Sequence, residues 1–167
     1  MFQPKPIENA GKAEFYRDLT EQVNALLGDE RDGIANAANL SAYLFMTLPA
    51  VSWVGFYFLH ANAELVVGPF QGKPACVRIA LGKGVCGKAA ERRQSILVED
   101  VHVFPGHIAC DSASRSELVI PLIKEGELLG VLDLDSPDLA RFDAEDQAGL
   151  KGIAAIYVRA SDRPIRA

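Results

Sequence analysis

The feature that most constrains the fold is a central block of strand-type sequence with helix-type sequence on both sides of it. Apolar residues recur at helical spacing in segments 12–28 and 32–49, where Asp32 is suited to cap the second helix and Pro49 to end it. Segment 142–159 predicts a closing helix, with Asp143 as its cap. The strand-type segments between them are 51–59, 64–67, 76–81, 95–99, 117–124 and 127–135.

Strand segments that follow one another closely favour an antiparallel sheet, and Glu125 and Gly126 form a turn between the last two. Helices gathered at both ends of the chain are expected to cover one face of that sheet. The other face then lies under the irregular segment 100–116. We therefore expect an α+β fold, with six strands and one domain over residues 1–167, because no linker or repeat divides the chain.

The charge balance excludes several classes of partner. The 167 residues carry 17 Lys and Arg against 22 Asp and Glu, a net charge of -5, whereas nucleic acids and anionic membranes attract clustered positive charge. The longest nearly uncharged run, 44–63, contains Pro49 and His60 and does not fit a membrane span. No apolar stretch follows the charged N-terminal residues, so we expect no secretory signal and a cytoplasmic protein with reduced thiols.

Two carboxylates occupy positions at which a strand usually presents apolar side chains. Side chains alternate along a strand, so Asp133 and Asp135 point the same way, with α-carbons roughly 7 Å apart. The alternation in segment 127–135 assigns Leu129, Val131, Asp133 and Asp135 to one face and Leu128, Leu132 and Leu134 to the other. By the same rule Trp53 and Tyr57 share a face of the first strand.

If these faces coincide with that of Glu117 in the neighbouring strand, an indole, a phenol and three carboxylates line one pocket. Such a pocket suits a small cationic or zwitterionic molecule. A simpler interpretation stays open, in which Asp133 and Asp135 merely end their strand and the two aromatic residues belong to the core.

The three cysteines, Cys76, Cys86 and Cys110, form no CxxC motif. Cys110 lies in the long polar segment beside His107, where a thiol is accessible and reactive. Cys86 lies at the expected start of a helix near Gly84, where the helix dipole and Lys83 or Lys88 are expected to lower the thiol pKa. The residues alone leave the order of action of the two thiols open, and a structural role for some of the cysteines as well.

A metal site is a weaker alternative for the same segment. His102, His107 and Cys110 offer three ligands, but the sequence provides no obvious fourth. The glycines around Cys86 lack the phosphate-loop pattern and are interpreted as a strand-to-helix turn.

Five segments together closely resemble the free methionine-(R)-sulfoxide reductases, which are stand-alone GAF-domain enzymes. The resemblance extends over roughly residues 53–150. The segments are FQGKPACVRI (70–79), GKGVCGKA (82–89), EDVHVFPGHIACD (99–111), SRSELVIPL (114–122) and GVLDLDSP (130–137).

This resemblance implies a GAF-like fold and an activity that needs neither a metal nor a cofactor. It implies that Cys110 is the nucleophile, that Cys86 is the resolving cysteine and that Cys76 is a further cysteine of less settled function. The positions that match the family's substrate pocket are Trp53, Tyr57, Glu117, Asp133 and Asp135.

In the chemistry that the resemblance implies, the Cys110 thiolate attacks the sulfoxide sulfur while a protonated carboxyl group assists the departing oxygen. The resulting sulfenic acid condenses with Cys86 to a disulfide, which a thioredoxin-like dithiol reduces. The carboxylates bind the amino group of free methionine, and Trp53 contacts its methyl end. The oligomeric state, including a homodimer, is left open.

Two other functions remain as alternatives. A non-enzymatic GAF sensor would bind a small molecule and signal through an effector domain, for which 167 residues leave little room. A thiol peroxidase would share the sulfenic acid and disulfide steps, but it would not need carboxylates that bind an amine.

Overall fold

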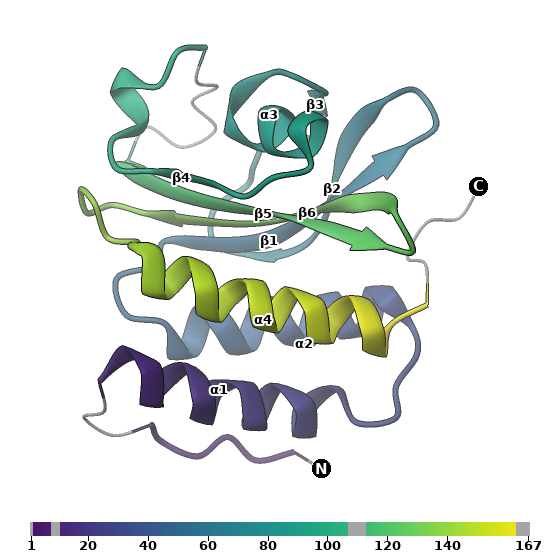
Figure 1. Ribbon diagram of the computed structural model, residues 1–167, viewed down its shortest axis with the longest axis vertical. Helices are drawn as coiled ribbons and strands as arrows, with labels where there is room; N and C mark the ends of the chain where they lie inside the picture. Colours follow the sequence, from purple (N-terminus) through teal and green to yellow (C-terminus); the bar gives the residue numbers. More distant parts are fainter. Residues whose placement is uncertain (1, 8–10, 107–112, 163–167) are drawn as a thin grey trace.

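The computed structural model describes residues 2–7, 11–106 and 113–162. Within them, a six-stranded antiparallel sheet is combined with four α-helices and a short 3-10 helix, η1 (Figure 1). The elements in chain order are α1 (Lys12–Leu27), α2 (Gly33–Thr47), β1 (Trp53–His60), β2 (Glu64–Gln71), β3 (Arg78–Ala80), α3 (Gly84–Arg92), β4 (Ile96–Val98), η1 (Val101–Val103), β5 (Ser116–Lys124), β6 (Glu127–Ser136) and α4 (Ala144–Ala160).

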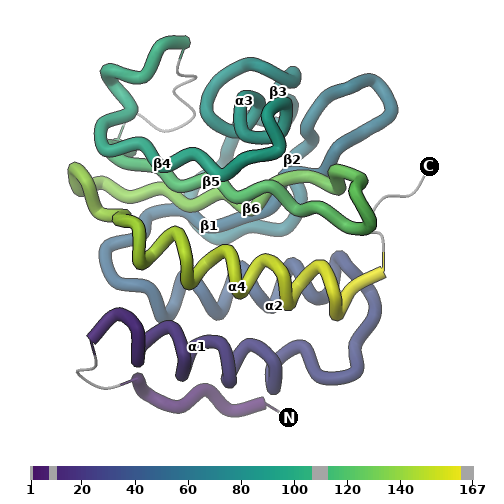
Figure 2. Tube along the Cα trace, in the orientation of Figure 1, coloured from purple at the N-terminus to yellow at the C-terminus, as the bar shows by residue number. Residues whose placement is uncertain are grey.

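The helices divide between the two faces of the sheet. α2 and α4 pack against one face, and α1 packs on these two helices as a further layer (Figures 1 and 2). α3 lies on the opposite face, on the same side as η1. The expected α+β fold with helices covering one face is confirmed. No described helix has the length and apolar character that a membrane span requires.

Local sequence explains where α2 and α4 begin. The Asp32 carboxylate accepts hydrogen bonds from the backbone N–H groups of Ile34 and Ala35, as predicted for a cap. Asp143 caps α4, and Asp146 completes a capping box with it. Ile34, at the first turn of α2, is 44% exposed, whereas Ala37 and Leu40 further along the helix are buried.

The sheet order is β3-β2-β1-β6-β5-β4, so β1, β6 and β5 lie at its centre. β2 continues four residues beyond the predicted segment 64–67 and pairs with β1 as far as Gln71. Position 68 in this strand has room only for a glycine, because a Cβ there would lie 2.6 Å from the ring of Phe58. β3 and β4 are shorter than predicted, with three residues each.

A β-bulge in β6 corrects the predicted alternation. Leu122 is paired with Gly130 but Ile123 with Leu128, so Leu129 is an extra residue. Leu128 therefore packs on the α3 side of the sheet and Leu129 on the α2 and α4 side, the reverse of the prediction. Gly130 has φ 154°, and a Cβ there would lie 2.0 Å from the Tyr57 carbonyl oxygen. Beyond this bulge the predicted faces are correct.

Candidate active site

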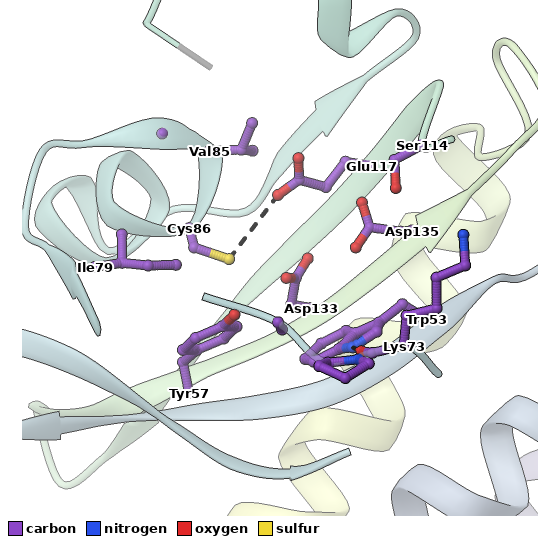
Figure 3. A pocket seen from close by; sticks show the side chains of 13 residues that line it. Trp53, Tyr57, Lys73, Ile79, Val85, Cys86, Ser114, Glu117, Asp133 and Asp135 are labelled. Carbon is purple, nitrogen blue, oxygen red and sulfur yellow. Dashed lines mark hydrogen bonds between the residues drawn. The ribbon is translucent and has the colours of Figure 1, made fainter. Parts of the chain in front are cut away.

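A pocket opens on the sheet face that carries α3. Side chains of β1, β5 and β6 form its floor, while the start of α3 and the loop between β2 and β3 form its walls (Figure 3). The structure brings together all five residues that the sequence placed in a pocket, along with Cys86. These lining residues are Trp53, Tyr57, Cys86, Glu117, Asp133 and Asp135.

Strand register explains why the acidic side chains meet. Asp135 of β6 is paired with Trp53 on one side and with Glu117 on the other, so these residues form a row across three strands. Asp133 lies two residues away on the same face, between Gly55 and Val119. Glu117 and Asp133 are each only 6% exposed. The sheet thus places two buried carboxyl groups and a third, partly buried one side by side.

Burial changes the protonation of these groups. Desolvation raises the pKa of Asp133 to about 7, although hydrogen bonds from Cys86 and Glu117 act in the opposite direction. Burial, followed by the charges of Asp133 and Asp135, raises the pKa of Glu117 well above its usual range. Asp133 Oδ1 is buried without a hydrogen-bond partner among the described residues. The pocket therefore holds a carboxyl proton near neutral pH, which it can donate to a ligand.

Cys86 lies in the first turn of α3, is 4% exposed, and points toward the carboxyl groups (Figure 3). Its Sγ lies 3.9 Å from Glu117 Oε1. Burial, followed by the charges of Asp133 and Glu117, raises the pKa of the thiol well above its usual value. The predicted lowering of this pKa by the helix start and the lysines is wrong, because desolvation and two acidic neighbours outweigh them.

One of the two lysines that were expected to lower the pKa of Cys86 interacts with another part of the chain. Lys88 Nζ donates a hydrogen bond to the Pro105 carbonyl oxygen and lies 4.4 Å from the centre of the Phe104 ring. It therefore fastens the segment after η1 to α3.

The other two cysteines differ in what the structure shows. Cys110, the predicted nucleophile, lies outside the described residues, together with His107 and Asp111. Cys76 lies in the loop between β2 and β3 and is disulfide-bonded, whereas Cys86 is a free thiol. The expected disulfide between Cys86 and Cys110 is therefore not formed in this structure, where the Cys86 side chain faces the carboxyl groups.

The aromatic residues of β1 form part of the pocket floor and also hold the neighbouring loop. The Trp53 ring stacks on Phe70 at 5.2 Å and on Tyr57 at 5.8 Å between centroids. Trp53 Nε1 donates to the Lys73 carbonyl oxygen at 3.1 Å, and the Tyr57 hydroxyl donates to the Cys76 carbonyl oxygen at 3.1 Å. Both aromatic residues thus have core-like burial and a polar end within the pocket.

Sequence reasoning missed several members of this site. Lys73 and Ser114 line the pocket, and Phe70 supports Trp53. All three lie inside the segments that carry the family resemblance, which was the only available signal, because their residue types have no distinctive spacing.

Potential metal ligands are found in a different place from the alternative set that the sequence offered. In that set, His102 is exposed, and His107 and Cys110 lie outside the described residues. Among the residues that the structure describes, Cys86, Glu117 and Asp133 offer donor atoms that all lie within 4.8 Å of one another.

Known proteins resemble this chain over most of its length. The GAF domain model matches residues 38–160. The free methionine-R-sulfoxide reductase of Escherichia coli strain K12 is 52% identical over 144 residues, which cover 86% of this chain and 87% of that protein.

Two solved structures extend the comparison to three dimensions. The free methionine-R-sulfoxide reductase from Neisseria meningitidis, solved in complex with its substrate, has a TM-score of 0.91 at 42% identity and covers 96% of this chain and 95% of its own. A putative GAF sensor protein from Burkholderia vietnamiensis has a TM-score of 0.87 at 57% identity, covering 91% and 96%. The chain therefore belongs to the GAF-domain family and, within it, to the free methionine-R-sulfoxide reductases.

Proposed function

We propose that the protein reduces free methionine (R)-sulfoxide to methionine by thiol chemistry. The observation that carries this proposal is the row of Trp53, Asp135 and Glu117 across three strands, beside the buried Asp133. A free amino acid presents an ammonium group that a peptide-bound residue lacks, and neighbouring carboxylates are suited to bind it. The epimer preference comes from the family.

The acidic groups divide between binding and proton donation. One ammonium group balances only part of the charge of three carboxylates, and burial favours the neutral form of the others. We assign the ammonium to the ionised carboxylates and the sulfoxide oxygen to a protonated carboxyl, for which Asp133 or Glu117 is suited. The Trp53 indole provides an apolar surface for the methyl end of the substrate.

The proposed reaction transfers one oxygen atom. The Cys110 thiolate attacks the sulfoxide sulfur to form an S–S bond, and the carboxyl proton passes to the oxygen. The hydroxyl group then moves to Cys110: the substrate S–O bond and the S–S bond break while a new S–O bond forms on the Cys110 sulfur. Methionine leaves, reduced by two electrons, and Cys110 retains the oxygen as a sulfenic acid. A second thiol then condenses with the sulfenic acid, releasing water and forming a disulfide. An external dithiol of the thioredoxin type, in a reducing compartment such as the cytoplasm, returns both thiols.

The cysteine states support a change in the identity of the resolving thiol. Cys76 is the described cysteine found in a disulfide, and Cys86 remains a buried neutral thiol. We therefore assign the resolving step to Cys76 and leave Cys86 to hydrogen-bond Glu117. Mass spectrometry after one turnover separates the two schemes: Cys76→Ser should stop at the Cys110 sulfenic acid, whereas Cys86→Ser should still form a disulfide. A disulfide in Cys76→Ser that joins Cys86 and Cys110 would restore the first scheme.

A coupled assay tests the activity itself. Purified protein, thioredoxin, thioredoxin reductase and NADPH are mixed with the R or the S epimer of free methionine sulfoxide. We expect NADPH oxidation with the R epimer and methionine formed in equal amount. A protein that binds the sulfoxide without turnover would act as a sensor, and one that consumes hydrogen peroxide but no sulfoxide would be a thiol peroxidase.

A further inference from the structure

We propose that the pocket is also a binding site for one thiophilic divalent cation such as Zn²⁺, held by Cys86, Glu117 and Asp133 in competition with the amino-acid substrate. The three side chains come from α3, β5 and β6. Their sulfur and oxygen donor atoms all lie within 4.8 Å of one another, and all three residues are buried.

A second observation points to an absent ligand. Asp133 Oδ1 is buried and has no hydrogen-bond partner among the described residues. A buried polar atom without a partner costs free energy, and a cation bound between the donors would remove that cost. Figure 3 shows the Asp133 carboxyl group in the space between Cys86 and Asp135, and not turned toward the strands below.

The donor set selects the type of cation. Zinc binds thiolate sulfur at about 2.3 Å and carboxylate oxygen at about 2.0–2.2 Å, so the donors around it lie roughly 3.5 Å apart. Sγ of Cys86 and Oε1 of Glu117 are separated by 3.9 Å, which is close to that spacing. A thiolate ligand favours Zn²⁺ or Cd²⁺ over Mg²⁺ and Ca²⁺, which prefer oxygen donors alone.

The space and the framework also suit a single ion. The pocket encloses a cavity of about 40 Å³, enough for roughly three waters. An ion with one water as its fourth ligand needs no more room than this. β5 and β6 are paired through this region, so the two carboxyl groups approach the ion by side-chain rotation.

Binding of the cation should exclude the substrate. The Cys86 thiol gives its proton to solvent as the metal–sulfur bond forms, and no electrons are transferred. The ion then occupies the carboxylates that the ammonium group of the amino acid needs. The inhibition is therefore expected to be competitive, and a chelator should reverse it.

Cadmium titration of metal-free, oxidised protein tests the site directly, because a thiolate-to-cadmium bond gives an ultraviolet charge-transfer band. We expect the band to saturate at one Cd²⁺ per chain and to be absent in Cys86→Ser. Glu117→Gln and Asp133→Asn should each weaken Cd²⁺ binding at least about tenfold, since even residues that only support a metal ligand change affinity by that much. Asp138→Asn, which changes an exposed carboxylate just beyond β6, is the matched control and should bind as wild type.

Three results would overturn the site: no band in the wild-type protein, a band that survives Cys86→Ser, or equal affinity in both carboxyl variants and the control. The two carboxyl variants provide separate tests if one of them fails to fold. Free methionine sulfoxide should raise the Cd²⁺ concentration needed for half-saturation. Because the band is read without turnover, an active protein with no band would refute only the cation site, and an inactive protein with a band would refute only the proposed function.

Discussion

The two faces of the central sheet are built from the same strands but serve different purposes. In β6, Leu132 and Leu134 are fully buried toward α2 and α4, whereas Asp133 and Asp135 face the pocket under α3. Burying a leucine stabilises the fold by about 1.5–3 kcal/mol, while burying an unpaired carboxylate costs free energy. One strand therefore combines core residues with acidic residues that line the pocket by alternation alone, which predicts that substitutions on the two faces have separable effects.

Asp133→Asn should give the largest effect on activity. We expect kcat/KM to fall by about 10²–10⁴-fold, the usual contribution of a positioned general acid. The free energy of unfolding should stay the same or rise, because the variant removes a buried ionisable group. Kinetics and urea denaturation on the same sample measure both quantities. A loss of stability in proportion to the loss of activity would show that the carboxyl group belongs to the core.

Leu132→Ala is the counterpart on the other face. It should lower the free energy of unfolding by about 2–5 kcal/mol through the cavity it leaves. Activity per folded molecule should remain near that of the wild type. Leu139→Ala, at a position 53% exposed, is the control and should change stability by less than about 0.5 kcal/mol.

Gly130→Ala should affect both faces together. The added Cβ would lie 2.0 Å from the Tyr57 carbonyl oxygen, so β1 and β6 must separate at the bulge. We expect a loss of roughly 1–3 kcal/mol in the free energy of unfolding and weaker substrate binding, because Tyr57 lines the pocket. Gly152→Ala in α4 meets nothing within 4 Å, and it should be neutral or stabilising because alanine favours helices. Substrate titration and denaturation compare the two variants. Equal free energies of unfolding for Gly130→Ala and Gly152→Ala would rule out a close approach of β1 to Gly130.

The change in the free energy of unfolding with pH should be the smallest of these effects. The folded-state pKa of Asp133 is raised to about 7. Between about pH 4 and pH 7 the folded protein therefore holds a proton that the unfolded chain has already lost. Its stabilising effect is full below about pH 4 and is lost as the pH rises toward 7. Asp143 has a pKa lowered to about 2, chiefly by its hydrogen bond to Lys12, and it acts only at more acidic pH. The free energy of unfolding, measured by denaturation, should be lower at pH 8 than at pH 5 in the wild type. This difference should be smaller in Asp133→Asn.

The sequence predicted the features that depend on local pattern, and it did not predict those that depend on contacts between distant segments. Alternation alone placed Asp133 and Asp135 on one face and Trp53 with Tyr57 on another, and strand register brought these faces together. The bulge at Leu129 could not be predicted, because one inserted residue leaves no periodic signal. At the next residue, Gly130, a Cβ would lie 2.0 Å from the Tyr57 carbonyl oxygen.

The thiol of Cys86 shows most clearly what a local sequence pattern cannot predict. Its neighbours along the chain are lysines at a helix start, which favour a lowered pKa. Its neighbours in space are Glu117 and Asp133, which, together with burial, raise the pKa. The sign of the shift therefore depends on contacts between segments about thirty to fifty residues apart, which a local pattern does not contain.

The most direct test of the pocket face is a comparison of kcat/KM for free methionine (R)-sulfoxide and for its N-acetylated, amide-blocked form. Blocking removes the ammonium group and leaves the sulfoxide unchanged. If the carboxylates of β5 and β6 bind that ammonium, the free amino acid should be preferred by at least about 100-fold, the equivalent of one or two charge-assisted hydrogen bonds. Equal kcat/KM values would contradict the account, because the buried acidic groups would then have no part in recognising the substrate.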